Sequence, residues 1–379
     1  MNFNYKEEQQ GFADSLKRWI ARDYGFEQRR AIVNSDRGTS GAAWATLVEL
    51  GMTALPVPEA QGGFDGGARD LFVVMRELGR GLVVEPYFAT VLGAQFLKLG
   101  GGHAGLLERV AGGGLTLACA LGERQSRHEL RDIATRAERS GDGWRLAGEK
   151  KTVVHGDQAG VLIVSARSSG AQREEAGISL FALPLDTPGV QVTGYRTLDG
   201  LRAADVRFEN VELAADAVIG LVDAGWDILE AGADYGAGLL CAEALGAMEA
   251  LFDATLDYLK TRQQFGVPIG KFQALQHRMA DMYIHLEQAR SMALLAAVTL
   301  DGQDAAERRR VVSAAKYRVG QAARFIGQQA VQLHGGMGVT DELAASHYFK
   351  RLSMIELTLG DRDHHLARFA AQPGFQEAA

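Results

Sequence analysis

The chain has 379 residues, which is too long for one ordinary hydrophobic core and suits two or three domains. Hydrophobic residues make up 47% and charged residues 23% of it, as in soluble globular proteins. The net charge of −7, with acidic and basic residues interleaved, excludes the basic surface that nucleic acids or anionic membranes require. No stretch approaches the ~20 apolar residues of a membrane span.

The two cysteines, Cys119 and Cys241, are far apart and lie in apolar neighbourhoods. They provide neither a disulfide framework nor a CxxC metal site, so a reducing compartment is expected. The first ten residues are polar and charged, without the apolar region of a secretion signal. We therefore expect a cytoplasmic protein with no metal, no nucleic-acid partner and no membrane anchor.

Residues 1–114 carry helical spacing that is interrupted by glycine-rich turns. Phe12, Leu16 and Ile20 recur at four-residue steps, which gives a helix one apolar face. Two prolines and a Gly-Gly pair make residues 56–63 a loop. This part of the chain is predicted to be an N-terminal helical domain.

The pattern changes over residues 115–216. Short runs rich in Val, Ile and Phe, at residues 161–164, 178–183 and 206–208, alternate with turn signals such as residues 140–143. Several strands at close spacing without helices between them predict an antiparallel β domain.

The helical period returns in residues 217–379. One helix is predicted by apolar residues at unbroken three-four spacing: Phe272, Leu275, Met279, Met282, Leu286, Ala289, Ala293, Ala296 and Leu300. A second is predicted in the same way by Val312, Ala315, Val319, Ala322 and Ile326. The C-terminal part is therefore a bundle of long helices. No GxGxxG follows a predicted strand and no GxxxxGK[ST] occurs, which disfavours Rossmann and P-loop sites.

The segment of residues 260–273 ends one long helix and begins another. Arg262 is thereby placed at a helix C-terminus, where its guanidinium suits a bidentate grip on a phosphate. Phe265 and Phe272 offer faces for an aromatic ring. The alternative is a cation that stabilises the helix dipole beside two core phenylalanines.

A second passage, residues 332–338, combines an amide with glycines. Gln332 can donate and accept, and glycines such as Gly335 and Gly336 let a ligand approach the backbone. The alternative is a helix C-cap with a glycine-rich turn. His334 is expected to be a structural hydrogen-bonding residue.

In this order, the two passages resemble the acyl-CoA dehydrogenase signatures RxxFGxxIxxFQxxQ and, about seventy residues on, QxxGGxG. The matching residues are Arg262, Phe265, Gly266, Ile269, Phe272, Gln273, Gln276, Gln332, Gly335, Gly336 and Gly338. The resemblance implies an α+β fold with an N-terminal helical domain, a middle antiparallel β-barrel and a C-terminal four-helix bundle. Within the family, the chain resembles small subunits of heteromeric enzymes, such as that of pimeloyl-CoA dehydrogenase.

This resemblance implies an FAD-dependent enzyme of fatty acid metabolism that dehydrogenates an acyl-CoA thioester, with an electron-transfer flavoprotein as acceptor. A carboxylate removes the α-proton while the β-hydrogen leaves as hydride to the flavin. In the family's dimers the two motifs reach across the interface to the adenine and pyrophosphate of the neighbour's FAD. The residues that inherit this cofactor-binding role are Arg262, Phe265, Ile269, Phe272, Leu275, Gln332, Gly335 and Gly336.

The sequence departs from the family where a member holds its own base. Leu359 occupies the position of the usual glutamate, and leucine cannot take a proton. Asp361 replaces a threonine that faces the pyrophosphate, and its charge would repel a phosphate unless a cation such as Arg362 intervened. The alternative base position in the family falls on Gly236, and the best substitute nearby is Asp234.

The β domain departs in the same way. Residues 152–155 align with the family's WIT(S/N) strand, and residues 122–127 align with its TEPxxGSD stretch. Neither segment matches the motif. His155 and Arg124 are possible replacement contacts, but surface roles are expected for both.

These departures favour a subunit that lacks its own base and completes the FAD site of a homologous partner in a heterotetramer. No catalytic residue is then assigned in this chain. One alternative is a self-sufficient homo-oligomeric acyl-CoA dehydrogenase that uses Asp234 or Asp361. Another is a flavin-dependent oxygenase of the same fold, which needs no base for an α-proton.

Overall fold

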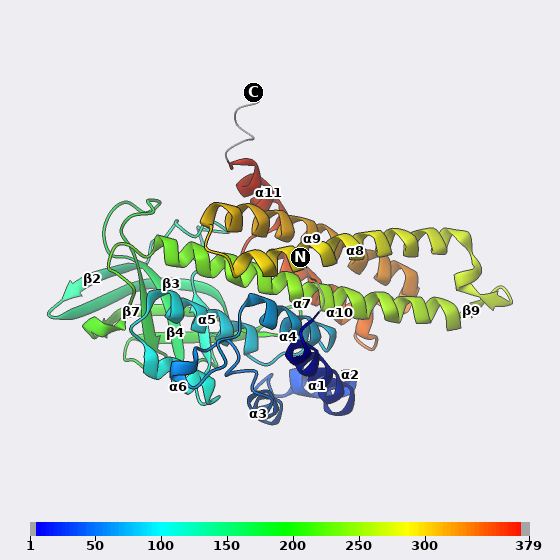
Figure 1. Cartoon of the computed structure of the whole chain (residues 1–379), viewed down its shortest axis with the longest axis horizontal. Coiled ribbons are helices and arrows are strands. Elements are labelled where there is room, and N and C mark those ends of the chain that lie inside the picture. Colours follow the sequence, from blue (N-terminus) through cyan, green and yellow to red (C-terminus); the bar gives the residue numbers. More distant parts are fainter. Residues whose placement is uncertain (1–4, 373–379) are drawn as a thin grey trace. The chain divides into compact units, whose positions relative to one another are not determined.

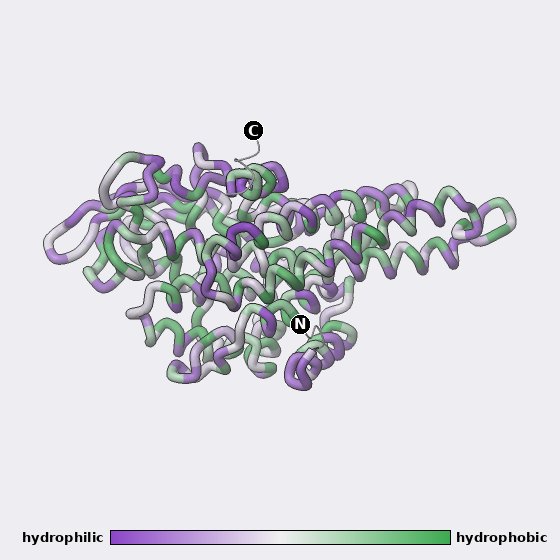
Figure 2. Tube along the Cα trace, turned by 45° about the horizontal axis from the view of Figure 1, so that its top comes forward, coloured by the Kyte–Doolittle hydropathy of each residue, from purple (hydrophilic) through white to green (hydrophobic). Residues whose placement is uncertain are grey.

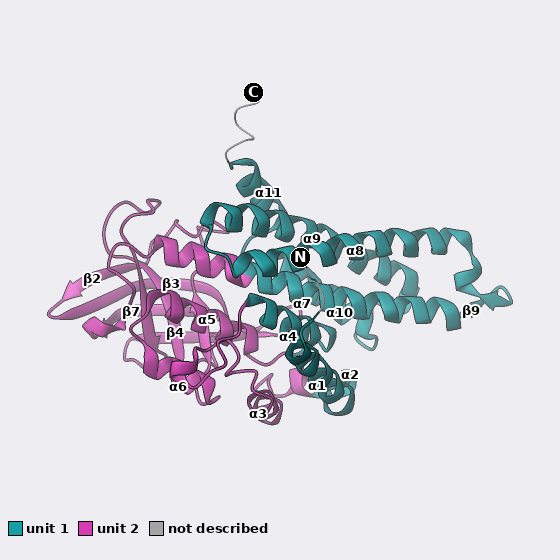
Figure 3. Cartoon of the chain, viewed as in Figure 1, with its two compact units in different colours: residues 1–31, 68–83, 237–379 teal, residues 32–67, 84–236 magenta. Residues whose placement is uncertain are grey.

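The structure is a computed structural model that describes residues 5–372. It separates into two compact units (Figure 3). Unit 1 comprises residues 1–31, 68–83 and 237–379, and unit 2 comprises residues 32–67 and 84–236. This division does not follow the three predicted domains, whose boundaries stay predictions.

Unit 2 holds a sheet and short helices. Its strands are β1 (Leu117–Ala120), β2 (Arg136–Ser140), β3 (Gly143–Val154), β4 (Val161–Arg167), β5 (Ile178–Pro184), β6 (Val190–Arg196), β7 (Arg202–Leu213) and β8 (Val218–Ile219). Its helices are α3 (Gly41–Glu49), α5 (Tyr87–Gly100) and α6 (Ala104–Ala111).

The eight strands follow the order β6-β7-β3-β2-β4-β5-β8, with β1 paired to β4 (Figure 1). Most neighbours pair antiparallel, as predicted, but β1 and β2 both run parallel to β4. The β domain is therefore mixed. A run of apolar residues shows that a strand is buried but does not identify its neighbour.

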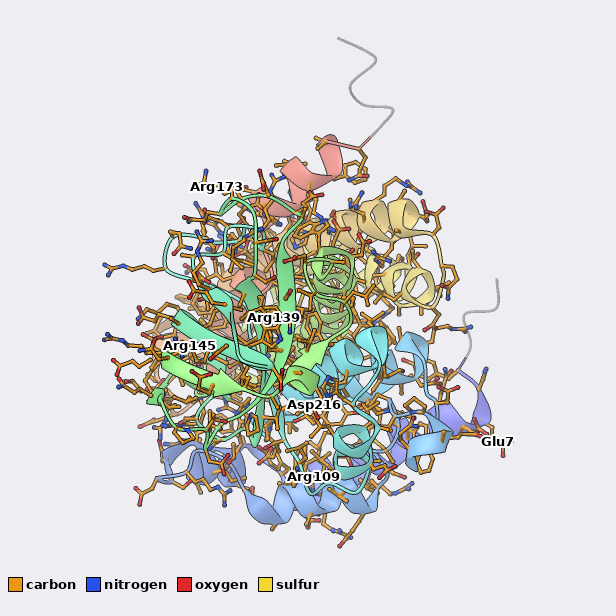
Figure 4. The ribbon with its side chains drawn as sticks, turned by 90° about the vertical axis from the view of Figure 1, so that its left-hand side faces the viewer. Glu7, Arg109, Arg139, Arg145, Arg173 and Asp216 are labelled. Carbon is orange, nitrogen blue, oxygen red and sulfur yellow. The ribbon has the colours of Figure 1, made fainter. Side chains whose placement is uncertain are left out.

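The core of the sheet follows the predicted apolar runs. Every residue of β4 is buried, and Trp144 on β3 packs against Phe181 on β5 with ring centroids 5.5 Å apart. The Arg139 guanidinium (Arg139 in Figure 4) lies over the Trp144 ring, 4.1 Å from the ring centroid. This cation–π contact adds to the packing around Trp144.

Unit 1 is built mainly from helices. Those in chain order are α1 (Glu7–Asp23), α4 (Ala68–Arg80), the larger part of α7 (Trp226–Thr261), α8 (Gln273–Leu300), α9 (Ala305–His334), α10 (Ala344–Leu357) and α11 (Arg362–Ala370). Helix α2 (Phe26–Asn34) lies at a boundary between the units. Polar and apolar residues alternate along these helices in Figure 2, and no described helix is long and apolar enough to cross a membrane.

The two helical patterns of the C-terminal part are confirmed. On α8, Met279, Met282 and Leu286 are buried, and on α9 all five predicted positions are buried. The first members of the α8 pattern differ, because Phe272 is 40% exposed. On α1 the buried face is centred on Leu16, as predicted, but runs through Ala13 and Trp19 instead of Phe12 and Ile20.

Helices α4 and α7 approach each other closely at two glycines. A Cβ atom added to Gly79 would lie 2.1 Å from the carbonyl oxygen of Glu243, and one added to Gly246 would lie 1.8 Å from that of Arg76. Only residues without a side chain allow this distance between the two backbones.

Candidate functional site

The segment after α7 forms a small hairpin that projects from the helices. Strands β9 (Gln263–Gln264) and β10 (Val267–Pro268) flank a two-residue turn of Phe265 and Gly266, whose φ angles are 55° and 78°. Positive φ at both central residues is what a type I′ turn requires. The Ile269 amide donates to the Arg262 carbonyl at 2.8 Å and closes the loop. Arg262 thus follows the last residue of α7, as predicted.

The aromatic rings of this hairpin face solvent. Phe265 is 88% exposed and Phe272 is 40% exposed, and their ring centroids are 5.9 Å apart at an angle of 85°. The alternative in which both are core residues is therefore wrong. Arg262 is exposed as well, and no carboxylate in the described part of the chain pairs with its guanidinium.

The second motif lies beside the first. Helix α9 ends at His334, and Gly335 follows with a φ of 61°, in the C-cap predicted from the glycines. Tyr258, one turn before Arg262, packs against His334 with ring centroids 4.5 Å apart and ring planes tilted by 34°. Its hydroxyl donates to the His334 carbonyl at 3.5 Å. The structure therefore brings the two motifs together through Tyr258, which the sequence analysis did not identify.

His334 has the structural role that was expected. Its Nδ1 lies 2.8 Å from the carbonyl oxygen of Ala330, and burial lowers the pKa of the imidazole. A Cβ atom on either Gly335 or Gly336 would meet nothing within 4 Å. The backbone of these two glycines is open to a ligand that approaches from outside the chain.

All eight residues of the predicted clamp lie in unit 1. Ile269, in the short 3-10 turn before α8, and Leu275, in the first turn of α8, are half-buried, and the other six are exposed. The Gln276 amide donates to the Gly270 carbonyl at 2.9 Å and fixes the turn before α8. The clamp is thus an outward-facing surface of arginine, aromatic rings, an amide and bare backbone.

The turn at residues 358–361 has no residue that can act as a base at the predicted position. Leu359 is half-buried, with a φ of 55°. Its carbonyl accepts from His365 Nε2 at 2.9 Å, and the Gly360 carbonyl accepts from Lys316 Nζ at 2.8 Å. The buried Lys316 also donates to the carbonyls of Ile355 and Glu356, at 2.9 and 3.0 Å. These hydrogen bonds hold the turn, and an aliphatic side chain lies at the position that was predicted to correspond to the family's glutamate.

The two substitute carboxylates have other surroundings. Asp361 is buried and caps α11 by accepting from the His364 amide at 2.8 Å. Arg362, the cation expected beside it, pairs with Asp363 at 3.5 Å. Asp234 is 2% exposed on the part of α7 that belongs to unit 2, where it has polar partners of its own.

The β strand expected to flank the flavin is irregular. Thr152 and His155 both have positive φ, 53° and 55°, and the pairing of β3 with β7 shifts between Lys150 and Val153. Asp205 accepts from the Thr152 amide at 3.2 Å. His155 is 3% exposed, so the surface role expected for it is wrong. Its Nδ1 lies 3.2 Å from Gln158 Oε1, a partner that sequence spacing did not reveal.

A buried ion pair lies next to the segment that departs from TEPxxGSD. Lys150 Nζ is 2.7 Å from Glu123 Oε1 and also donates to Ser165 at 3.1 Å. Burial acts to raise the pKa of Glu123, but the Lys150 ammonium and the hydrogen bonds from Gln125 and Thr135 together outweigh burial, and the pKa falls below its usual range. Arg124, next in sequence, is exposed, as expected. The ion pair joins the loop that contains Glu123 to β3, and its role is structural.

A separate cavity of about 260 Å³ lies among α4, α7 and α8. Arg76, Arg80 and Arg290 surround Glu249 there, at 2.8 to 3.1 Å, and no residue of the clamp lines it. Its charges are balanced by internal pairs. Among the described residues, no group of three or more His, Cys, Asp or Glu side chains is placed to hold a metal.

The buried Lys316 makes stability depend on pH in a defined direction. Burial lowers the pKa of Lys316 from its usual 10.5 to about 8. Between these values the unfolded chain holds a proton that the folded chain has released, so the free energy of unfolding rises with pH. We expect it to rise by roughly 2 kcal/mol from pH 8 to pH 10 relative to Lys316→Gln, measured by urea denaturation. If the free energy of unfolding changed equally with pH in the two proteins, the lowered pKa of Lys316 would be contradicted.

Three family models match successive parts of the chain. The acyl-CoA dehydrogenase N-terminal domain matches residues 6–103, the middle domain residues 118–211, and the C-terminal domain residues 223–372. The chain belongs to the acyl-CoA dehydrogenase family. The predicted α+β fold class is thereby confirmed, and members of this family typically bind FAD.

The chain is similar to acyl-CoA dehydrogenase FadE12 of Mycobacterium tuberculosis strain H37Rv, with 31% identity over 363 residues and 93% of each protein covered. Among solved structures it is similar to the Tcur3481-Tcur3483 steroid ACAD, with a TM-score of 0.89, 27% identity, and coverage of 98% of this chain and 99% of that one. It is also similar to the ChsE4-ChsE5 complex from Mycobacterium tuberculosis, with a TM-score of 0.88, 25% identity and 98% of each chain covered.

Proposed function

We propose that this acyl-CoA dehydrogenase family chain is a subunit that has no catalytic base and that completes the FAD site of a homologous partner. One observation carries the proposal. The clamp residues lie on the outside of the chain, with Phe265 88% exposed, while the base position holds Leu359 in a fixed turn. A chain that used these groups for its own cofactor would need them turned inward.

The clamp fits the adenine and pyrophosphate of FAD in its chemistry. The edge-to-face rings of Phe265 and Phe272 can pack against a flat heterocycle, and Arg262 has a guanidinium that no carboxylate in the described part of the chain neutralises. Gly335 and Gly336 leave room for a phosphate to reach backbone amides. Bound FAD would supply the hydride acceptor for the β-hydrogen of the substrate.

The chain supplies no group for removal of the α-proton. Leu359 is aliphatic, Asp361 is engaged in capping α11, and Asp234 is buried among its own partners. A general base must reach the proton that it abstracts. The base and the acyl pocket are therefore assigned to the partner chain, in a heterotetramer with two copies of each chain.

Two similar structures support an assembly of unlike chains, because their names pair two proteins: Tcur3481-Tcur3483 and the ChsE4-ChsE5 complex. The substrate class that goes with the proposal is an acyl-CoA thioester. Family membership supports an electron-transfer flavoprotein as electron acceptor, and we place the complex in the cytoplasm.

The proposal is tested by purifying the chain alone and together with a homologous dehydrogenase that has the glutamate. Alone, the chain is expected to bind little FAD and to show no turnover of acyl-CoA with an artificial electron acceptor. In the complex, Arg262→Ala is expected to weaken FAD binding by about ten-fold to a hundred-fold, the contribution of charge-assisted hydrogen bonds. Arg109→Ala, which removes an exposed arginine of unit 2, is the matched control and should leave binding unchanged.

Sustained turnover by the chain alone would refute the proposal. In that case Asp234→Asn identifies the base. Loss of turnover would support the self-sufficient enzyme with Asp234, whereas a retained rate would clear Asp234 and leave Asp361 as the remaining carboxylate named above.

A further inference from the structure

The loop between α9 and α10, residues 335–343, carries two glycines of the clamp, and we call it the clamp loop. Near its start it packs closely on α9, because a Cβ atom added to Gly338 would lie 2.4 Å from the carbonyl oxygen of Val331. Met337 is exposed and Val339 is 74% exposed, so burial of these side chains contributes little to holding the loop. Its other end must therefore be held by specific contacts.

His347, in the first turn of α10, joins the end of the clamp loop to helix α2. Its Nε2 lies 3.0 Å from the carbonyl oxygen of Asp341 in the loop, and its Nδ1 lies 3.0 Å from Nη1 of Arg29 on α2. Arg29 is buried, and its Nε donates to the Leu82 carbonyl at 2.9 Å, which fixes the guanidinium. The Phe26 ring meets the imidazole edge to face at 5.0 Å. We call the two hydrogen bonds of His347 the His347 latch.

The latch requires one protonation state of the imidazole. Arginine can only donate, so Nδ1 must offer its lone pair to Arg29, and the proton lies on Nε2, which donates to the Asp341 carbonyl. A second proton would go to Nδ1. It would set donor against donor and place a positive charge 3.0 Å from a buried guanidinium. The latch therefore forms only while His347 is neutral.

The charged groups around the ring also oppose a second proton. On α2, Arg29 is in direct contact, and Arg30 acts on the Asp341 carboxylate while it pairs with Glu27 at 3.1 Å. On α10, Lys350 pairs with the same Asp341 carboxylate. This pairing offsets the negative charge that the clamp loop would otherwise place beside the imidazole.

The direction of the pH effect follows from these surroundings. Burial lowers the pKa of His347, and the Arg29 and Lys350 charges lower it further, against the hydrogen bond to the Asp341 carbonyl. When the loop opens, the imidazole regains an ordinary pKa of about 6.5. The open form then binds a proton more readily than the closed form. Falling pH favours opening below about pH 6.5, by up to about ten-fold for each pH unit.

We propose that His347 is a positioning residue for the clamp: the neutral imidazole fixes the clamp loop to α2, and protonation releases the loop. The link with FAD rests on the proposed function, which assigns Gly335 and Gly336 to the cofactor of a partner. FAD binding by the clamp then weakens with falling pH, although none of the eight clamp residues has a group that titrates in this range.

The test is amide hydrogen exchange of the full chain, read by mass spectrometry without FAD or a partner. Exchange is measured at about pH 7.5, 6.5 and 5.5 and corrected for the intrinsic effect of pH on the rate. Protection of the clamp loop is expected to fall by roughly ten-fold between pH 6.5 and pH 5.5. The interior of α9, residues 311–326, should keep its protection over the same range.

Two variants assign the effect to His347. In His347→Gln, the amide can accept from Arg29 and donate to the Asp341 carbonyl but does not titrate. It should keep the loop protected at pH 7.5 and abolish the pH dependence. His285→Gln is the matched control, because His285 on α8 is half-buried and its Nδ1 accepts from Arg318 on α9 at 3.1 Å in the same way. It should leave the pH dependence of the clamp loop unchanged.

Two results would overturn the latch. One is equal protection of the clamp loop at pH 7.5 and pH 5.5 in the native chain, which needs no variant to fold. The other is a pH dependence that survives His347→Gln, which would point to His334 at the start of the loop. Neither result involves flavin, a partner or turnover, so failure of the latch is distinguishable from failure of the proposed function.

Discussion

Replacing Arg351 with methionine is expected to lower the free energy of unfolding by about 3–5 kcal/mol. Arg351 on α10 donates to both carboxylate oxygens of Glu243 on α7, from Nε at 2.6 Å and from Nη2 at 2.8 Å. Both side chains are buried. The substitution leaves the Glu243 charge in the interior without its guanidinium, and the loss is measured by urea denaturation.

The double variant Glu243→Leu with Arg351→Met is the first control. It removes both charges and should recover most of the loss, because apolar residues of similar volume often replace a buried pair without cost. Arg145→Met is the second. Arg145 pairs with Glu212 at 2.6 Å on exposed positions of β3 and β7, so its loss should cost less than about 1 kcal/mol. A loss for Arg351→Met as small as that for Arg145→Met would contradict the argument.

Replacing Gly246 with alanine is expected to lower the free energy of unfolding by about 3 kcal/mol or more. The new Cβ would lie 1.8 Å from the carbonyl oxygen of Arg76, and Gly79 makes the reciprocal contact with the carbonyl of Glu243. Backbone atoms cannot rotate away as side chains do, so α4 and α7 would have to separate. The change is read from thermal and urea denaturation.

Gly11→Ala is the matched control for this substitution. Gly11 lies in α1, and an added Cβ would meet nothing within 4 Å. Alanine there should raise the free energy of unfolding by about 0.5–1 kcal/mol, because glycine loses more conformational freedom on folding. Similar effects at Gly11 and Gly246 would show that helix propensity, and not the close approach of the helices, governs both sites.

The helical architecture could be predicted because the apolar residues that become buried recur at helical spacing in the sequence. Met279, Met282 and Leu286 recur at the helical repeat and are buried in α8. The end of α7 before Arg262 followed from local signals, glycine and proline among them. The parallel pairing of β1 with β4 could not be predicted, because the two strands are more than forty residues apart and apolar content does not identify a neighbour.

The motifs identified the clamp residues but not their environment. Phe272 continues an apolar helical pattern and was assigned to it, yet it lies at the N-cap of α8 and is 40% exposed. Tyr258, which joins the two motifs, carries no signal beyond an aromatic residue in a helix. Polarity alone would place His155 and Lys150 at the surface, yet both are buried, and Lys150 pairs with Glu123, which is distant in sequence.

The turn at Phe265 constrains how this chain can change. A bulky residue with a φ of 55° works against its own backbone preference, and the ring gains almost no burial, at 88% exposed. Glycine in its place would relax the backbone and favour the isolated chain, but would remove the aromatic face. Screening for thermal stability of the lone protein would therefore select against the aromatic ring that the proposed role in a partner's cofactor site requires.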